Sequence, residues 1–572
     1  MSIENVIDAA MGRVPCELVL RNCNIVNVFS GEIEQGDMGI YAGQIVGIGD
    51  YDGEQSVDVE GKFVSPGFFD SHVHIESSMV EVPEYARAVV PRGTTSVVID
   101  PHEIANVLGL DGIRYMLESS KYNPLNVFVM LPSCVPATQF ETAGAYLRAF
   151  DLYPLIRDKW ILGLGEMMNF PGIINNEPEV LDKVKMATNN YKRIDGHAPG
   201  LTGKELNAYI SAGIYSDHEC TTVPEAREKL AKGMHIMIRE GSATKNLHDL
   251  LPLINEKNAR RILFATDDRH PNELLDQGHI DYMLKEAVAF GVDPIEAIRM
   301  VTLNAAEYFD INKIGAIAPG YMADLVILDD LKDFQIADVY KKGQLVAHRG
   351  KLTIELSHPR NIFLRSSVNI KWLTPDDFKI KAKAKNIRVI GLIPKQIITE
   401  ELILPAKIVD GYAESDIERD ILKIVVVDRH NASDKISIGF VKGIGLKSGA
   451  IAQSIAHDSH NIVAVGTNDD DLIKAVIEVS KMKGGIAVVA DGEVVETLAL
   501  PVAGLISNKP LEYVREKADS LIRALKNLGA TVHDPMMALS FLCLPVIPQL
   551  KITDKGLFKV DDFDFVDLFV KE

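Results

Sequence analysis

The pattern of hydrophobic and polar positions changes twice along the chain and so predicts three regions. Residues 17–48 alternate apolar and polar positions and carry turn signals at residues 31–37 and 42–43, which is typical of short strands and a hairpin. From residue 62 to about residue 315, short apolar runs alternate with longer stretches of helical spacing, such as 82–92 and 225–232. Repeated alternation of strand and helix predicts a parallel sheet.

Eight candidate strands fall in this central region. They are residues 64–70, 95–100, 126–131, 161–166, 193–197, 214–218, 235–238 and 262–267. A run of eight strand–helix units is typical of a closed barrel, because eight parallel strands can close on themselves. We therefore expect residues 62–315 to form a (β/α)8 TIM-like barrel.

The β pattern returns after the barrel and predicts two further units. Strands expected at residues 323–328 and 339–348 would complete the first small sheet, which needs more strands to be stable. This predicts a small composite β domain from both flanks of the barrel, residues 1–61 and 316–365. Residues 366–572 are expected to form a C-terminal α+β domain. Its strands are expected at 421–428, 437–441, 462–467 and 485–490, and its helices at 470–483 and 510–528. The expected fold class is α/β.

Composition and charge limit the binding partners and the cellular compartment that we expect for this chain. Of the 572 residues 47% are hydrophobic, so the chain can bury a large core. With 60 basic and 80 acidic residues, the formal charge of −20 argues against nucleic acid and against an anionic membrane surface. The five cysteines are too scattered for a disulfide scaffold, and no apolar run approaches a membrane span or a signal peptide. A cytoplasmic protein with no membrane partner is expected.

Residues that bear chemistry stand at the ends of the predicted strands. His72 and His74 are two apart, so in a strand both imidazoles face the same side. Four further candidates close the fourth, fifth, sixth and eighth strands: Glu166, His197, His218 and Asp267. Barrel enzymes take their catalytic side chains from the C-terminal ends of several strands, at one rim. Imidazoles and carboxylates gathered there suit one or two divalent cations.

This arrangement is similar to that of the amidohydrolase superfamily. More specific stretches resemble the microbial adenine deaminases over nearly the whole chain: HVHIESSM (72–79), DPHEIANV (100–107), TDDR (266–269), GFVKGIGLKSGAIA (439–452), AHDSHN (456–461), VGTN (465–468) and LPVAGL (500–505). The resemblance implies hydrolytic deamination of the small molecule adenine to hypoxanthine and ammonia. Many relatives carry a carboxylated lysine on strand four, but this chain has Glu166 there and no lysine in residues 161–169. Glu166 would therefore supply the carboxylate directly.

The resemblance also implies roles for these residues. The metal ligands would be His72, His74, Glu166, His197, His218 and Asp267. Asp267 would take a proton from a metal-activated water and pass it to the substrate. Glu166 would either bridge two metals or act as acid–base toward a ring nitrogen, and His197 or His218 could instead polarise the substrate. Such donors suit Mn²⁺, Fe²⁺ or Zn²⁺; the resemblance favours a binuclear centre of Mn²⁺ or Fe²⁺.

Seven residues are weaker candidates for substrate contacts: Ser77, Ser78, His102, Glu103, Arg269, His457 and His460. The two serines either orient the purine or cap the helix expected at residue 82. His102 and Glu103 either act at the rim of the barrel or form the acidic N-terminus of a helix. Arg269 either holds Asp267 or Asp268 or makes a surface salt bridge. The loop at 457–461 either reaches the barrel mouth and helps close the pocket or is a turn far from it.

Three other functions compete with adenine deamination. The first is another reaction on the same scaffold, either hydrolysis of a cyclic amide or deamination of adenosine or guanine. The C-terminal motifs argue against cyclic amidases, and the HAPG at 197–200 differs from the HAGE typical of adenosine deaminases. A non-catalytic barrel scaffold conflicts with retention of every candidate ligand, and a nucleic-acid deaminase conflicts with the acidic charge. The oligomer expected is a homodimer or larger.

Overall fold

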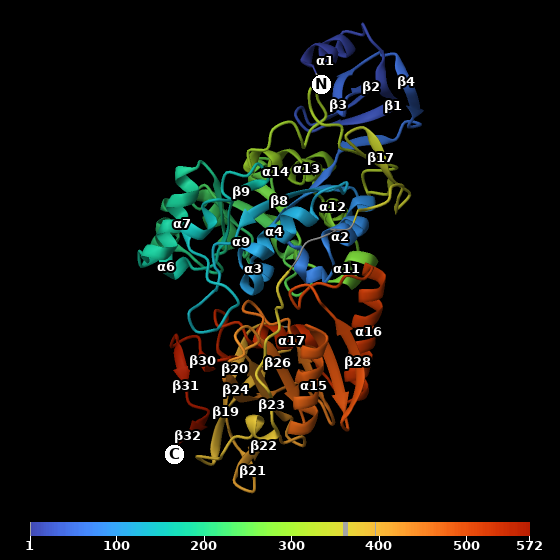
Figure 1. Cartoon of the computed structure of the whole chain (residues 1–572). Helices are drawn as coiled ribbons and strands as arrows, with labels where there is room; N and C mark the ends of the chain where they lie inside the picture. Colours follow the sequence, from blue (N-terminus) through green and yellow to red (C-terminus); the bar gives the residue numbers. More distant parts are fainter. Residues whose placement is uncertain (1, 358–363, 395, 572) are drawn as a thin grey trace.

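The computed structural model describes residues 2–357, 364–394 and 396–571. Figure 1 shows the described chain as three stacked parts, with an N-terminal sheet at one end, the barrel in the middle and the C-terminal half at the other end. The predicted boundaries, 1–61 with 316–365, 62–315 and 366–572, stay a prediction. Residues 1, 358–363, 395 and 572 of those ranges lie outside the described residues.

The first sheet joins strands from both flanks of the barrel. In the described chain its order is β18-β17-β16-β15-β5-β1-β2-β3, with β4 beside β1. The strands are β1 (Cys16–Asn27), β2 (Glu32–Tyr41), β3 (Gln44–Ile48), β4 (Gly53–Asp58), β5 (Phe63–Pro66), β15 (Leu325–Leu328), β16 (Ile336–Lys341), β17 (Gln344–His348) and β18 (Lys351–Leu352). The composite sheet is thus confirmed. A helix that the pattern did not predict, α1 (Ile3–Ala10), precedes it.

The hairpin predicted at residues 42–43 is also present. Strands β2 and β3 pair antiparallel on either side of Ala42 and Gly43, whose φ angles are 57° and 75°. Two consecutive residues with positive φ match the twist of a two-residue hairpin, and the glycine adopts this conformation without steric cost.

The barrel strands follow one another in chain order. They are β6 (Phe68–His74), β7 (Thr94–Ile99), β8 (Asn126–Leu131), β9 (Ile161–Met167), β10 (Arg193–Gly196), β11 (Ser216–Asp217), β12 (His235–Arg239) and β13 (Ile262–Ala265), which continues as β14 (Asp267–Asp268). The described strands pair in parallel as β10-β9-β8-β7-β6-β14 and β11-β12-β13. Pairing of β14 with β6 closes one seam. At the other seam, Ala198 N–H donates to the Asp217 Oδ1 at 2.8 Å.

The first predicted barrel strand, 64–70, was wrong at its start. Residues 63–66 form β5, which pairs with β1 and β15 of the other sheet, and β6 begins only at Phe68. Gly67 lies between them, and a Cβ there would come within 2.2 Å of the Thr95 Oγ1. The apolar run is continuous because both strands are buried, so the pattern does not reveal the change of sheet.

Helices cover the outside of the barrel and connect its strands. They are α2 (Val82–Val89), α3 (His102–Leu108), α4 (Leu110–Ser119), α5 (Ala149–Leu152), α6 (Phe170–Ile174), α7 (Pro178–Asn189), α8 (Gly203–Ser211), α9 (Val223–Ala231), α10 (Leu247–Leu250), α11 (Pro271–Asp276), α12 (Ile280–Phe290), α13 (Pro294–Met300) and α14 (Leu303–Tyr308). Within the described chain, no helix combines the length and apolar character needed to cross a membrane.

The C-terminal half is a second large sheet with helices, as predicted. In the described residues its order is β20-β19-β24-β23-β26-β25-β27-β28, with β32 beside β19. The strands are β19 (Asn386–Leu392), β20 (Thr399–Pro405), β23 (Ile421–Val427), β24 (Ile436–Lys442), β25 (Ala450–Gln453), β26 (Ile462–Gly466), β27 (Gly485–Ala490), β28 (Glu493–Ala499) and β32 (Phe569–Val570). Smaller sheets comprise β21 (Lys407–Val409) with β22 (Tyr412–Glu414), and β29 (Leu550–Thr553), β30 (Gly556–Lys559) and β31 (Asp564–Val566). The helices are α15 (Asp469–Lys481), α16 (Leu511–Asn527) and α17 (Pro535–Leu542).

The C-terminal half is attached to the barrel beside strand β6. The Ser507 N–H donates to the Met79 carbonyl at 2.8 Å, just after the two histidines of β6. Arg87 of α2 pairs with Glu512 at the start of α16. In Figure 1, α17 and the end of α16 nearest α11 lie where the C-terminal half meets the barrel. This attachment brings C-terminal side chains to the rim where the candidate metal ligands lie.

Candidate metal centre

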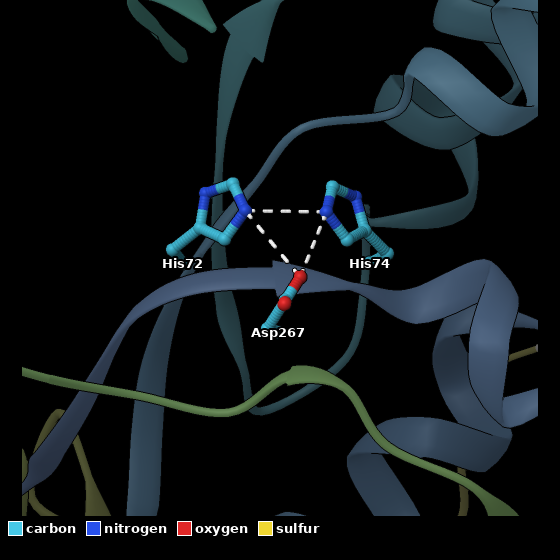
Figure 2. A group of neighbouring side chains, drawn as sticks. All are labelled: His72, His74 and Asp267. Atoms are coloured by element: carbon cyan, nitrogen blue, oxygen red, sulfur yellow. Dashed lines mark hydrogen bonds and ion pairs between the residues drawn. The ribbon is translucent and has the colours of Figure 1, made fainter. Parts of the chain in front are cut away.

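The two histidines of β6 face the aspartate that ends the barrel. Figure 2 shows His72, His74 and Asp267 pointing toward one another. The Nε2 atoms of the two histidines are 3.2 Å apart, and the Asp267 Oδ1 lies 3.1 Å from His74 Nε2 and 3.7 Å from His72 Nε2. All three side chains are buried. The spacing of two along β6 therefore does place both imidazoles on one side.

Glu166, near the end of β9, lies between two groups of imidazoles. Its Oε1 is 3.2 Å from the His74 Nε2 and 3.8 Å from the His72 Nε2. Its Oε2 is 3.2 Å from the His218 Nε2 and 2.6 Å from the His197 Nδ1. His197 directly follows β10 and His218 directly follows β11. The structure thus brings all the predicted ligands together around one carboxylate.

The donor set fits divalent cations. Donors that lie about 2.0–2.2 Å from one tetrahedral ion are about 3.3–3.5 Å from each other, so the spacings of 3.1–3.8 Å that His72 and His74 make with Glu166 and Asp267 leave room for an ion. His197 differs, because its 2.6 Å contact with Glu166 has hydrogen-bond length. Imidazole nitrogens and carboxylate oxygens are donors that Mn²⁺, Fe²⁺ and Zn²⁺ all accept.

Asp100, which follows β7, fixes two of these ligands. Its carbonyl accepts a hydrogen bond from the His74 Nδ1 at 2.8 Å, which leaves the His74 Nε2 lone pair for a cation. Its Oδ2 accepts the Glu166 N–H at 2.9 Å. A Cβ at Gly165 would lie 1.9 Å from that same oxygen, so only glycine fits before Glu166. The motif DPH pointed to this loop, but no pattern in the chain indicated that Asp100 holds two of the ligands in place.

Arg239 holds the second oxygen of Asp267. The Arg239 Nη1 donates to the Asp267 Oδ2 at 2.8 Å and also pairs with Glu219. Asp267 itself has a φ of 57°, a left-handed conformation that is uncommon outside glycine and that aspartate tolerates better than most residues. Arg239 was not among the residues predicted for the site. It ends β12, the seventh strand, so the same rule of strand ends would have found it.

The surroundings keep the carboxylates ionised. Burial by itself raises the pKa of Glu166, but the His197 imidazole, followed by other imidazoles, holds it well below its usual range. Burial likewise raises the pKa of Asp267, while the hydrogen bond from His74 and the charge of Arg239 hold it well below its usual range. Buried anions of this kind are compensated by cations. The centre is therefore electrostatically suited to bind metal.

A cavity lies next to this centre, between the barrel and the C-terminal half. Four of the weaker candidates line it: Ser77, Glu103, His457 and His460. Asp268 lines it too, and the Ser77 hydroxyl donates to the Asp268 Oδ1. The loop at 457–461 therefore lies at the barrel mouth rather than far from it.

The remaining weaker candidates do not line the cavity. The Ser78 hydroxyl donates to the Ile75 carbonyl at 2.6 Å. The alternative that either serine caps α2 was wrong, because the residue before that helix is Glu81 and no side chain caps it. His102 is buried with its Nδ1 3.3 Å from the Glu166 Oε1, so it lies at the metal centre instead.

Neither role expected for Arg269 is present. Its side chain is buried and donates to the carbonyls of Gly278 at 3.1 Å and Glu240 at 2.7 Å. It is therefore neither a surface salt bridge nor a partner of the two aspartates. Its guanidinium has the shape and the donors to tie two loops together, which the sequence pattern does not distinguish from an ion pair.

Comparison with known proteins agrees with this geometry. Residues 63–346 match the model of the amidohydrolase family, and residues 396–564 match the adenine deaminase C-terminal domain. An adenine deaminase of Desulfatibacillum aliphaticivorans is 51% identical over 99% of both chains, and adenine deaminase 2 of Carboxydothermus hydrogenoformans is 50% identical over 99% of both. The solved structure of an enamidase, an amidohydrolase, has a TM-score of 0.45 and 18% identity, covering 60% of this chain and 98% of that one. The chain belongs to the adenine deaminase family of amidohydrolases.

Proposed function

We propose that this protein hydrolyses adenine to hypoxanthine and ammonia. The observation that carries the proposal is the buried centre of imidazoles and carboxylates beside a cavity. The names of the relatives that match this chain over nearly its full length support adenine as the substrate.

Membership of the amidohydrolase family implies a divalent cation, and the His and Asp groups at the rim could hold one. We propose two ions, Mn²⁺ or Fe²⁺ rather than Zn²⁺. His72, His74 and Asp267 would hold one and His197 and His218 the other, with Glu166 between them. The support for a bridging rather than an acid–base role of Glu166 is that each of its oxygens faces a different group of imidazoles. A divalent cation supplies hydroxide near neutral pH, because it lowers the pKa of a bound water to about 7.

Asp267 is proposed to move the protons. Carbon 6 of adenine is a poor electrophile and its amino group is a poor leaving group, so the amine must be protonated as it departs. The Asp267 Oδ1 would accept a proton from the attacking water and deliver it to that nitrogen. Arg239 keeps the Oδ2 engaged at 2.8 Å, so the carboxylate presents a single oxygen to the reaction.

The remaining expectations also stay proposals. We propose a homodimer, for which Trp372, 90% exposed, offers apolar surface. We propose a cytoplasmic location, which is supported by five cysteines that are buried and unpaired, as is typical of a reducing compartment. Light scattering on the purified protein decides the first, and cell fractionation the second.

A substrate panel tests the proposed function. The metal-loaded protein is incubated with adenine, adenosine, guanine and dihydroorotate, and ammonia, hypoxanthine and ring opening are measured. We expect ammonia and hypoxanthine in equal amounts from adenine alone. Turnover of dihydroorotate, or no turnover of adenine by protein with metal bound, would overturn the proposal.

A further inference from the structure

The cavity next to the metal centre has walls from both halves of the chain. The barrel contributes Ser77, Glu103 and Asp268, and the C-terminal half contributes His457 with residues that include Met536 of α17. Asp268 follows Asp267 directly, so the cavity opens beside the proposed proton carrier. A substrate whose reacting carbon lies at Asp267 would therefore extend its other end toward the C-terminal half.

His457 is fixed in this wall by a carboxylate from the barrel. The His457 Nδ1 lies 2.6 Å from the Glu103 Oε1, at the start of α3. Its ring stacks on Phe541 with 4.9 Å between centroids. Glu103 can only accept, so the His457 Nδ1 carries a proton. Burial lowers the pKa of His457, but the charge and hydrogen bond of Glu103, with the charge of Asp268, raise it to about 9, so at neutral pH the Nε2 carries a proton as well. Within the described residues, the hydrogen bond of the His457 ring to a protein group is made by Nδ1, which leaves the Nε2–H free.

His460 binds the other oxygen of the same Glu103 carboxylate. Its Nδ1 accepts the Ala456 N–H at 3.1 Å, so its Nε2 carries the proton and donates to the second oxygen of Glu103. Arg429, fully buried, donates to the His460 carbonyl and to the Ala503 carbonyl. The loop that presents His457 is thus held from three directions.

This cluster is satisfied by its own hydrogen bonds. The His457 Nδ1 lies 2.6 Å from one oxygen of Glu103, and the His460 Nε2 donates to the other, so the two imidazoles occupy both oxygens. The Nε2 of His457 therefore remains as a hydrogen-bond donor on the cavity wall.

We propose that His457 contacts the purine substrate, its Nε2 donating a hydrogen bond to the unsubstituted N9 of the free base in the tautomer that carries its imidazole proton on N7, and that Glu103 is its positioning residue. The inference rests on the proposed function, because a purine with carbon 6 at Asp267 turns its imidazole edge away from the metal centre. A nucleoside carries its sugar at N9 and has no lone pair there to accept. The contact therefore selects the free base over the nucleoside, and it gives the C-terminal half a direct part in substrate recognition.

Product binding tests the inference without turnover. Calorimetry on the metal-loaded protein compares hypoxanthine with 9-methylhypoxanthine, which cannot accept a hydrogen bond at N9. We expect the wild type to prefer hypoxanthine by about ten- to hundredfold, and His457→Ala to lose most of that preference by binding hypoxanthine more weakly. His430→Gln is the matched control: this histidine bonds the Ser459 carbonyl of the same loop but does not line the cavity, so its preference should stay as in the wild type. An unchanged preference in His457→Ala, or no purine binding by the wild type, overturns the inference.

The role of Glu103 is tested by a double-mutant cycle. Glu103→Gln should weaken the binding of hypoxanthine about tenfold. Adding Glu103→Gln to His457→Ala should weaken that binding little further, because both substitutions remove the same contact. A merely structural role of Glu103 would give additive losses, and that outcome would overturn its assignment. A wild type that binds hypoxanthine with the expected preference but does not deaminate adenine would reject the proposed function alone.

Discussion

Two clusters of histidine and glutamate in this protein have the same residue types but different spacing. Around His74 at the barrel rim, the donor atoms are 3.1–3.2 Å apart, and Glu166 shares its two oxygens between several imidazoles. In the second cluster, Glu103 binds His457 directly at 2.6 Å. The wider spacing around His74 leaves space for a cation, whereas the second cluster, like the 2.6 Å contact of His197 with Glu166, is satisfied by its own hydrogen bonds. Residue type alone therefore does not identify a metal site.

The largest expected effect comes from removing the shared carboxylate. Glu166→Ala should lower kcat/KM for adenine by about a thousandfold or more, because both groups of imidazoles lose their common anion and metal binding fails with them. Metal analysis and ammonia release measure the two losses. The control is Glu103→Gln, which should keep its metal. Full metal content and turnover in Glu166→Ala would contradict the bridging role.

Removal of the metal by a chelator tests whether cations bind at the first cluster and not at the second. Removing metal should abolish deamination, and adding Mn²⁺ should restore it with about two ions per chain. The melting temperature should fall on chelation, because a ligand that binds only the folded state stabilises it. Titration of the metal-free protein followed by elemental analysis gives the count. Three ions in the wild type and two in Glu103→Gln would show that the second cluster is also a metal site.

The sequence predicted the ligands better than their supports. Each predicted ligand closes a barrel strand, and the parallel pairing of those strands brings their ends to one rim. The role of Asp100 was missed because it depends on which neighbouring atoms it reaches, at 2.9 Å, and this is a property of packing. Arg239, in contrast, ends β12 and could have been found from its place at a strand end. The first barrel strand was placed wrongly because β5 and β6 form one apolar run that changes sheet at Gly67.

The second cluster could not be predicted from the sequence either. Residues 103 and 457 are 354 positions apart, and no spacing rule connects them. The motif AHDSHN marked the loop, but whether it reached the barrel depended on how the two halves dock, through contacts such as that of Ser507 with Met79. Local pattern predicts elements well and interfaces poorly.

Substitution of either of two buried arginines is expected to have an effect of intermediate size, on catalysis for one and on stability for the other. Arg239 donates to Asp267 at the metal centre, while Arg269 donates only to backbone carbonyls and a glutamine. Arg239→Met should lower kcat about ten- to hundredfold with a smaller change in KM, because Asp267 loses the bond that orients it. Arg269→Met should mainly lower the melting temperature. Steady-state kinetics and thermal unfolding separate the two, and equal kinetic losses in both variants would refute a specific role for Arg239.

The smallest effect is expected where the two halves meet beside the second cluster. Burial, followed by the nearby charge of Asp458, raises the pKa of Glu141 from 4.5 to about 8. A carboxyl with a raised pKa in the folded state contributes stability that is fully present below pH 4.5 and is lost as the pH rises through 8. Glu141→Gln cannot ionise, so it should be about as stable as the wild type near pH 4.5 and more stable by about one to a few kcal/mol above pH 8. Urea denaturation at the two pH values measures this difference. If Glu141→Gln and the wild type differed in stability by the same amount at both pH values, Glu141 would be ionised in the folded protein. This interface, unlike the metal centre, would then tolerate a buried anion without a cation.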